Sequence, residues 1–301
     1  MNQPFHPDTQ LSNIPTNVRH FLWNDDYIEL LAHKLDLQKV RTLVDIGSGL
    51  GYLSGVFAVY MRPGATVYGF DLDETVIKQA QTFADQNPYS VNFKFQVADA
   101  HQLPLADGQA DLVICQHLLV FMKDAAAVVA EMCRTVRPGG KVVAFEPNSL
   151  AQSLVLDSVS STYTIQQRLD QVRYQAYYER GKRHLGGGDD SVGDRLPQLF
   201  LNAGLTNIEV RLSDKSSALV PPYDTDEKRA RVHELRTWGE AYRANRDYIR
   251  TCFLKGGGSD AEWDAFDAWE RTENTRMLEQ LDREEFVSAG GLMTYIVIGT
   301  R

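Results

Sequence analysis

Strand-like and helix-like segments alternate over residues 40–148, and this alternation limits the possible folds more than any other feature of the chain. Short apolar runs such as TLVDIG and TVYGFDLDE are followed by segments with apolar residues at helical spacing, such as YLSGVFAVYM and TVIKQAQTFADQN. The short connections are typical of strand–helix–strand units in a parallel sheet with helices on both faces. Because such crossovers are right-handed, we predict an α/β fold with a doubly wound, mostly parallel sheet.

A different pattern follows Asn148. Residues 152–184 have helical spacing and end at LGGGDD; their predicted apolar stripe is Ile165, Leu169, Val172 and Ala176. LPQLFLNAGL predicts a short helix. NIEVRLSD and GGLMTYIVIGTR predict two strands that could add an antiparallel pair to the sheet edge.

Residues 215–290 lie between those two strands and are predicted to be mostly helical. One apolar face is marked by Trp238, Tyr242, Ile249 and Phe253. Ser259 and Glu262 have the spacing of a capping box, which predicts the start of a further helix. Aromatic residues at helical spacing predict a core here rather than a ligand pocket.

The segment VDIGSGLGY, residues 44–52, has glycines at every second position directly after a predicted strand. The spacing of Gly47, Gly49 and Gly51 places the third glycine one residue earlier than the dinucleotide-binding pattern GxGxxG does. A Walker A loop is excluded because no GK[ST] follows. The carboxylate of Asp45, just before the loop, would repel a pyrophosphate and attract an ammonium group. The loop is therefore predicted to bind a ligand that carries a cation.

Two further acids follow the next two predicted strands. Asp71 comes 26 positions after Asp45 and ends the second predicted strand. A carboxylate at this position can accept hydrogen bonds from both hydroxyls of a ribose. Asp99 ends the third strand and could accept a hydrogen bond from an adenine amino group. Taken singly, such a glycine or acid is as often structural as functional. Together, these features describe a site for an adenosine that carries an amino acid.

Four segments within about residues 40–148 resemble the class I S-adenosylmethionine-dependent methyltransferases: VDIGSGLG, GFDLDE, VADAHQLPLADGQADLVIC and EMCRTVRPGGKVVAFEPN. The resemblance implies a Rossmann-like, seven-stranded methyltransferase fold with S-adenosyl-L-methionine as cofactor. It also implies transfer of a methyl group to a small molecule, whose identity stays unassigned, by in-line displacement.

The resemblance assigns cofactor-binding roles to residues at four strand ends. Asp45 and the backbone of Gly47, Ser48 and Gly49 would hold the methionine end, in a loop that Gly51 completes. Asp71 would hold the ribose, and Leu72 would flank the adenine. Asp99 and Ala100 would face the adenine amine and ring, and Gln116 would contact the cofactor near its methionine portion.

A general base is needed only if the acceptor must lose a proton. His117, just after the fourth predicted strand, and Glu146, at the end of the fifth, are the candidates because both strand ends should face the cleft. The alternatives are a packed histidine and a glutamate that holds a loop backbone. Family members of quinone biosynthesis carry a histidine pair where this chain has Val120 and Phe121, which disfavours quinone C-methylation.

The segment RYQAYYERGKRHLGGGDD supplies candidate substrate residues, namely Tyr177, Arg180 and His184. Their rings could stack on a planar substrate, and their charges could attract an acidic group. The alternative is the solvated end of a helix, where basic residues suit the dipole of the C-terminus.

We predict five parts: an N-terminal arm and helix (1–38), a cofactor-binding core (39–149), a helical cap (150–195), a final helix with the edge strands (196–214 and 291–301) and a helical insertion (215–290). Compact family members join the last two strands by a short connection, whereas about 75 residues intervene here, too many for a structureless loop. The insertions are predicted to cap the cleft and set specificity, or to form a homodimer contact.

Composition and net charge limit the classes of partner that we expect. The net charge of −9, from 31 basic and 40 acidic residues, disfavours nucleic acid. No cysteine or histidine spacing indicates a metal site, and no segment approaches the roughly 20 apolar residues of a membrane span. The start MNQPFHPDTQ lacks the pattern of a secretory leader, so a cytoplasmic location is expected. The alternatives are a non-catalytic or regulatory protein that binds S-adenosylmethionine, and an NAD(P)-dependent Rossmann oxidoreductase.

Overall fold

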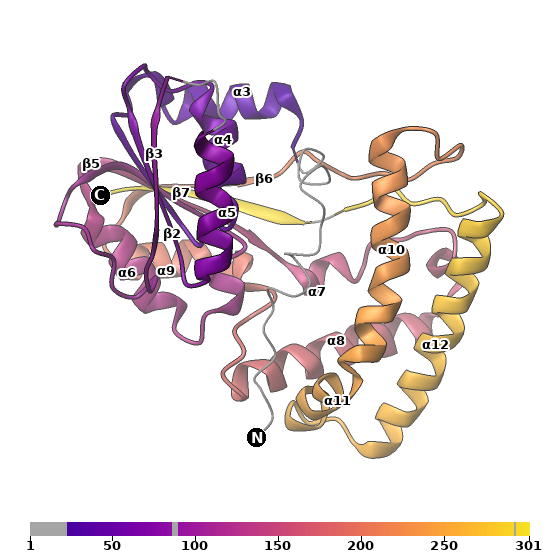
Figure 1. The fold of residues 1–301 in the computed structure, drawn as a ribbon. Coiled ribbons are helices and arrows are strands. Elements are labelled where there is room, and N and C mark those ends of the chain that lie inside the picture. The colour runs from indigo at the N-terminus through magenta and orange to yellow at the C-terminus, as the bar shows by residue number, and fades with distance from the viewer. Residues whose placement is uncertain (1–22, 86–89, 292) are drawn as a thin grey trace. The chain divides into compact units, whose positions relative to one another are not determined.

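The computed structural model describes residues 23–85, 90–291 and 293–301, and the chain divides into two compact units (Figure 1). The first, named the sheet unit, comprises Trp23–Asn148, Ser191–Asp214 and Thr294–Arg301. The second, named the helical unit, includes Ser149–Asp190 and Lys215–Met293. The predicted N-terminal arm, up to residue 22, lies outside the described residues.

The sheet unit is built on seven strands in the order β3-β2-β1-β4-β5-β7-β6. Their bounds are β1 Thr42–Ile46, β2 Thr66–Asp71, β3 Asn92–Val97, β4 Ala110–Gln116, β5 Val136–Pro147, β6 Thr206–Leu212 and β7 Thr294–Thr300. Strands β1 to β5 are parallel, and β7 runs antiparallel to both β5 and β6. The predicted doubly wound, mostly parallel sheet with antiparallel pairing at its edge is therefore confirmed.

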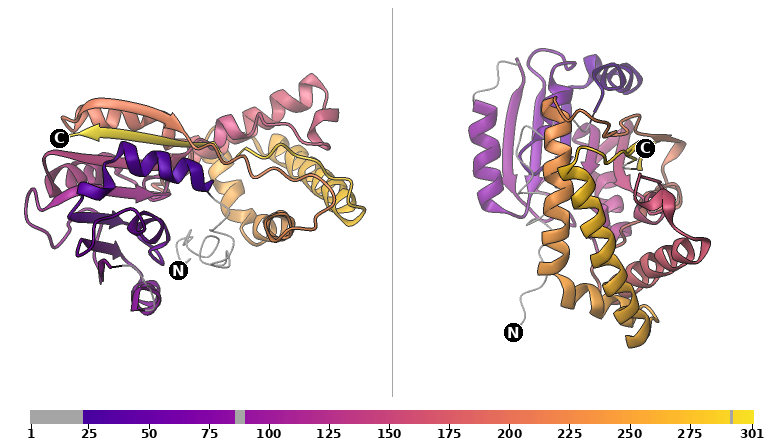
Figure 2. Two further views of the ribbon diagram at one scale, coloured as in Figure 1. Left: turned by 90° about the horizontal axis from the view of Figure 1, so that it is seen from above. Right: turned by 90° about the vertical axis from the view of Figure 1, so that its right-hand side faces the viewer.

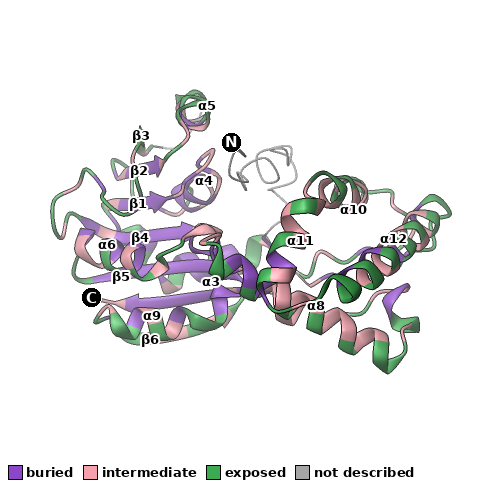
Figure 3. Cartoon of the chain, turned by 90° about the horizontal axis from the view of Figure 1, so that it is seen from below, coloured by how far each residue is buried: buried purple, intermediate pink, exposed green. Residues whose placement is uncertain are grey.

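Helices follow β1, β2 and β4, as the alternating pattern predicts, whereas the segment between β3 and β4 contains no helix. Those of the sheet unit are α3 Asp25–Lys34, η2 Leu37–Lys39, α4 Tyr52–Ala58, α5 Glu74–Asp85, η3 Leu119–Phe121, α6 Ala125–Thr135, η5 Val192–Arg195 and α9 Leu196–Asn202. The central strands β1 and β4 are buried along almost their whole length (Figure 3) because helices cover both faces of the sheet. Their side chains, including Val44, Ile46 and Val113, form the core of this unit.

The helical unit consists of α7 Ser149–Gln152, η4 Ser160–Thr162, α8 Ile165–His184, α10 Asp226–Ala244, α11 Arg246–Lys255 and α12 Asp260–Asp282. Helix α12 begins at a capping box of Ser259 and Glu262, which confirms that prediction. Helices α10 and α12 contact each other (Figure 2). No described helix has the length and apolar character needed to cross a membrane.

Helices α8 and α11 pack at a close crossing made by glycines. A Cβ atom on Gly181 would lie 1.6 Å from the carbonyl oxygen of Cys252. One on Gly256 would lie 1.8 Å from the carbonyl oxygen of Tyr177. Any larger residue at either position would overlap the backbone of the other helix, so both glycines are required for this contact.

The predicted apolar stripe of residues 152–184 is wrong. Ile165 is 80% exposed and Leu169 is 54% exposed, because this helix packs through its glycine crossing and its tyrosine rings instead. The helix also begins later than predicted, since Thr164 caps it and the carboxylate of Asp157 binds the backbone of the preceding segment. Trp238, predicted on an apolar face, is 65% exposed.

Candidate functional site

The parallel strands β1 to β5 bring their carboxyl ends to one edge of the sheet. The glycine loop follows β1, which lies between β2 and β4. The other predicted cofactor and catalytic residues end or follow β2, β3, β4 and β5. The fold therefore gathers residues that are about 100 positions apart in the sequence along a single edge, where ligands bind in sheets of this type.

The glycine loop needs its glycines for backbone reasons. Gly47, Gly49 and Gly51 have φ angles of +65°, +52° and +75°, in the left-handed region that other residues rarely adopt. A Cβ atom on Gly51 would lie 2.4 Å from the ring of Phe95. The glycines thus have a structural role whether or not a ligand binds. Because they lack side chains, they also let a ligand come close to the loop backbone.

Asp71 connects the end of β2 to this loop. Its Oδ2 atom accepts a hydrogen bond from the Gly49 amide at 3.0 Å, and its Oδ1 atom accepts one from the Asp73 amide at 3.1 Å. The adjacent Leu72 is 66% exposed, so its side chain is free to contact a ligand. The carboxylate expected to bind a ribose is therefore held in a fixed position.

Asp45 and Ser48 are buried polar residues with unmet hydrogen-bonding capacity. Within the described part of the chain, Asp45 Oδ2 and Ser48 Oγ have no hydrogen-bond partner. Burial raises the pKa of Asp45 to about 7, against the opposing effect of hydrogen bonds from Ser54. A buried acceptor without a donor is costly. An ammonium group would satisfy it, so this arrangement fits the amino-acid end of S-adenosylmethionine.

Asp99 follows β3 and is fixed by its neighbour His101. Its Oδ1 atom accepts the His101 amide at 2.9 Å and lies 2.7 Å from His101 Nδ1. These hydrogen bonds hold the pKa of Asp99 below its usual value, so the side chain is a carboxylate at neutral pH. Ala100 packs into the core of the sheet unit, and Gln116 lies half-buried at the end of β4.

Glu146 is fully buried and binds the turn after β4. Its carboxylate accepts the amides of Leu118 at 2.9 Å, Leu119 at 2.8 Å and Val120 at 3.1 Å. Burial raises the pKa of Glu146 to about 7, although the three amides act in the opposite direction. This is the geometry of the loop-holding alternative, and its catalytic role stays a prediction.

His117 begins the turn that Glu146 holds. Its backbone is left-handed, with φ +50°, and its amide donates to the carbonyl oxygen of Phe145 at 2.9 Å. The side chain is half-buried. The backbone of this candidate base is therefore fixed between β4 and β5, at the edge where the predicted cofactor residues gather.

A second positioning network was not evident from the sequence. Glu131 accepts the Leu103 amide at 2.6 Å, and Arg134 donates to the Leu105 carbonyl at 2.8 Å and to Asp107 at 2.7 Å. These contacts hold the segment that follows Asp99. The three-residue spacing of Glu131 and Arg134 predicts only a local helical pair, since their loop partners lie nearly 30 positions earlier.

The three candidate substrate residues lie on α8, in the helical unit, whereas the predicted cofactor residues lie in the sheet unit. The Tyr177 ring contacts Phe253 edge-on at 5.4 Å, and His184 Nδ1 lies 3.3 Å from the Lys255 carbonyl oxygen. Arg180 is exposed. Two of the three thus contact α11, and a substrate role for them stays a prediction.

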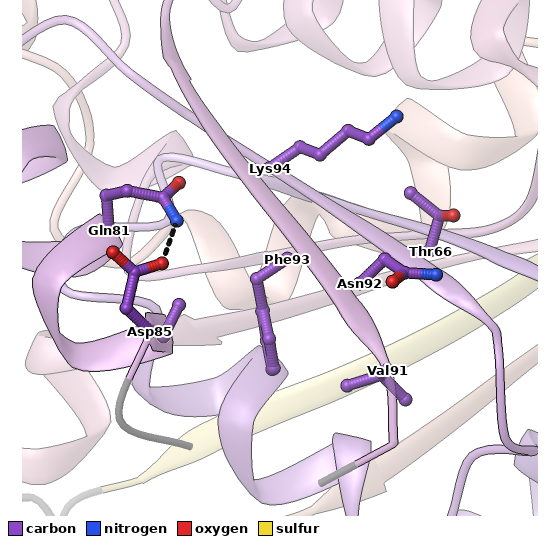
Figure 4. Close-up of a pocket in the computed structure, with 8 residues that line it drawn as sticks. Thr66, Gln81, Asp85, Val91, Asn92, Phe93 and Lys94 are labelled. Atoms are coloured by element: carbon purple, nitrogen blue, oxygen red, sulfur yellow. Dashed lines mark hydrogen bonds between the residues drawn. The ribbon is translucent and has the colours of Figure 1, made fainter. Parts of the chain in front are cut away.

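A hollow of about 550 Å³ lies near the amino-terminal ends of β2 and β3 (Figure 4). It is lined by Thr66 and Asn92, which begin β2 and β3, and by Gln81 and Asp85 of α5. Because the predicted cofactor residues follow the opposite ends of these strands, this hollow is not the candidate site. Among the described residues, no three histidine, cysteine or acidic side chains are placed to hold a metal ion.

Residues 44–144 match the methyltransferase domain family, a match that runs from β1 to β5 and includes the glycine loop, Asp71 and Asp99. This segment of the chain is therefore a methyltransferase domain of the class I, S-adenosylmethionine-dependent kind. S-adenosylmethionine is the methyl donor of this family. The match ends within β5 and leaves the helical unit outside it.

Curated relatives match this chain to different extents, and the chain spans about half the length or less of the two relatives that are more than 30% identical over 125 residues or more. The ubiquinone biosynthesis O-methyltransferase of Thiobacillus denitrificans is 33% identical over 125 residues, or 42% of this chain, which spans 52% of that relative's length. The demethylmenaquinone methyltransferase of a Geobacillus species is 25% identical over 206 residues, which cover 67% of this chain and 85% of that protein. The YcgJ protein of Bacillus subtilis shares the fold, with a TM-score of 0.51 at 16% identity, over 92% of this chain and 99% of that one.

Proposed function

We propose that this methyltransferase binds S-adenosylmethionine at the glycine loop and transfers the methyl group to a small-molecule acceptor. The observation that carries the proposal is the pair of buried, unmet polar atoms at Asp45 and Ser48, beside a loop tied to Asp71. The bound cofactor supplies an activated methyl group, which an acceptor takes by in-line displacement. The chain's own residues then need to hold and orient the cofactor and the acceptor, and to exclude water.

The chain's residues divide this work by their chemistry. Asp45 would pair with the ammonium group of the methionine end, and Ser48 would offer its hydroxyl to the same end. Asp71, fixed by the Gly49 amide, would accept hydrogen bonds from the ribose hydroxyls. The adenine would lie between Leu72 and Ala100, with its amino group toward Asp99. Gln116 would contact the methionine portion from β4.

A proton acceptor at this edge is supplied best by His117. Glu146 already accepts three backbone amides, so its carboxylate positions the turn that carries His117. His117 would remove a proton from an acceptor that must lose one, and would be dispensable for an acceptor that need not.

The test is cofactor binding measured by titration calorimetry with S-adenosylhomocysteine and with NAD⁺. We expect S-adenosylhomocysteine to bind and NAD⁺ not to bind. Asp71→Ala should weaken that binding at least about tenfold, because charge-assisted hydrogen bonds contribute about 1.5–3 kcal/mol. Asp85→Ala, a change of an exposed acid at the far end of α5, is the control and should leave affinity unchanged. Binding of NAD⁺ alone would overturn the proposal.

A non-catalytic protein that binds S-adenosylmethionine is the second candidate, because binding alone does not establish turnover. Incubation with the labelled cofactor and a metabolite extract separates the two. We expect label to appear in a small molecule, whereas binding without transfer would favour the regulatory alternative.

We further propose that the helical insertions, predicted as a cap, select the acceptor, since specificity in shared folds resides in such additions. Exchanging them between relatives with different acceptors would test this. A homodimer contact and a cytoplasmic location also stay predictions, and light scattering on the purified protein tests the first.

A further inference from the structure

Three carboxylates lie at three-residue intervals along α12, and the middle one has no partner among the residues that the structure describes. Asp267 and Glu273 are buried and each is paired with arginine. The pairs are Asp267 with Arg246 at 2.9 Å and with Arg271 at 2.7 Å, and Glu273 with Arg276 at 2.6 Å. Glu270, between them, has no hydrogen bond or ion pair with any described residue. The local arginines are thus used by its neighbours.

Aromatic rings cluster around the part of α12 that carries this carboxylate. Tyr174 of α8 stacks on Phe266 of α12 with ring centres 3.4 Å apart, and Phe266 contacts Trp269 at 5.6 Å. Tyr163 meets Trp269 edge-on at 5.2 Å. Phe266 lies four residues before Glu270 on α12, so the two side chains share a face of the helix. The charge of Glu270 contributes to raising the pKa of the hydroxyls of Tyr163, Tyr174 and Tyr242. We name as the Glu270 cluster the side chains of Tyr163, Tyr174, Tyr242, Phe266, Trp269 and Glu270.

The cluster is reachable and polar groups in it remain unsatisfied. Each of its members is partly exposed rather than sealed in the core. In the described structure, neither the carboxylate of Glu270 nor the hydroxyl of Tyr174 has a hydrogen-bond partner, and the indole N–H of Trp269 is buried without one. Burial and the charges of Glu273 and Asp267 raise the pKa of Glu270 to about 7. A positive ligand would relieve both the desolvation and the repulsion.

The chemistry selects one class of ligand. Aromatic faces and a carboxylate both attract cations, and their combination is a common way to bind alkylated ammonium groups. An anion would be repelled by the unpaired carboxylate of Glu270, since the charges of Asp267 and Glu273 are compensated by arginines. A metal ion would need further ligands, and no group of three suitable side chains exists among the described residues.

We propose that the Glu270 cluster is a binding site for an organic ammonium ion. The alkyl groups would lie against the rings, and the positive charge would face the carboxylate of Glu270. This site lies wholly within the helical unit and outside the segment that matches the methyltransferase family. It goes beyond the proposed methyl transfer and does not depend on it.

The test is a fluorescence titration of the full chain with tetramethylammonium chloride, against sodium chloride at equal ionic strength. Three of the four tryptophans, Trp238, Trp263 and Trp269, lie in the helical unit and report on it. We expect a saturable change with tetramethylammonium and none with sodium. Choline should reproduce the change, and its neutral isostere 3,3-dimethylbutanol should not.

Two matched variants on α12 complete the test. Glu270→Gln keeps the shape and removes the charge, and should weaken tetramethylammonium binding at least about tenfold. Glu279→Gln, an exposed residue of the same helix, should bind as the parent does. Binding of S-adenosylhomocysteine, measured on both variants, shows that the protein is folded and tests the proposed function separately. A parent protein that shows no saturable change, or a Glu270→Gln variant that binds equally well, would overturn the proposal.

Discussion

We predict that Asp45 makes cofactor binding depend on pH. Its pKa in the free protein is raised to about 7 by burial, so it is partly protonated at neutral pH. A bound ammonium group favours the ionised form and would lower that pKa. Affinity for S-adenosylhomocysteine should therefore rise from about pH 6 to about pH 8 and then level off. Calorimetry at several pH values measures this.

The matched variant for that experiment is Asp45→Asn, which has no charge to titrate. Its affinity should be weaker than that of the parent and insensitive to pH in this range. If the parent shows the same affinity throughout, the ammonium group is not at Asp45, and the orientation proposed for the methionine end is wrong.

Glu146→Gln distinguishes a positioning residue from a base. A glutamine has one acceptor oxygen where the native carboxylate uses two to bind three amides. We expect a loss of about 1–3 kcal/mol in the free energy of unfolding, with reduced but measurable turnover. Urea denaturation and initial rates measure the two effects. A variant with full stability and no turnover would instead identify Glu146 as the base.

At the scale of elements, the contact between α8 and α11 rests on Gly181. Alanine there would place its Cβ atom 1.6 Å from a backbone oxygen, and a backbone atom cannot move aside as a flexible side chain can. Gly181→Ala should cost at least about 2 kcal/mol, despite the better helix propensity of alanine. Arg180→Ala, next to it and exposed, should change stability by less than about 0.5 kcal/mol. Tryptophan fluorescence during urea denaturation reports this, and equal stability of the two variants would contradict it.

Elements with strong local signals were predictable from the sequence. The five parallel strands, the helices between them and the capping box of α12 each depend on short-range periodicity or spacing. The exposed Ile165 shows where that reasoning fails. Apolar spacing identifies a helical face, but which face is buried depends on Gly181 and its partner helix, about 70 positions away. Tertiary packing therefore determines which face of α8 is buried, and the periodicity of the sequence does not show it.

The residues of the candidate site also fall into two groups, those whose positions the sequence predicts and those whose contacts it does not. The positions of Asp45, the glycine loop and Asp71 near strand ends were predictable because they belong to two short local motifs, VDIGSGLG and GFDLDE. The hydrogen bonds of Glu146 to the turn after β4 were not, since they join positions 26 to 28 residues apart and require the pairing of β4 with β5. The Glu270 cluster was missed because aromatic residues at helical spacing are usually core.

At the scale of the whole molecule, two separate insertions make one compact unit. The chain leaves the sheet unit after Asn148 and after Asp214, and returns at Ser191 and at Thr294. Helix α8, from the first insertion, packs against α11, from the second. The helical unit is therefore built from both insertions.

This division predicts that two ligands will protect different parts of the chain from hydrogen exchange. S-adenosylhomocysteine should slow exchange in peptides that contain the glycine loop and Asp71. Tetramethylammonium should slow exchange in peptides from α8 and α12, where a bound cation would hold Tyr174 and Glu270 together. Mass spectrometry with each ligand alone measures both effects. Protection of the α12 peptides by S-adenosylhomocysteine alone, with no effect of tetramethylammonium, would mean that the Glu270 cluster responds to the cofactor and is not a separate site.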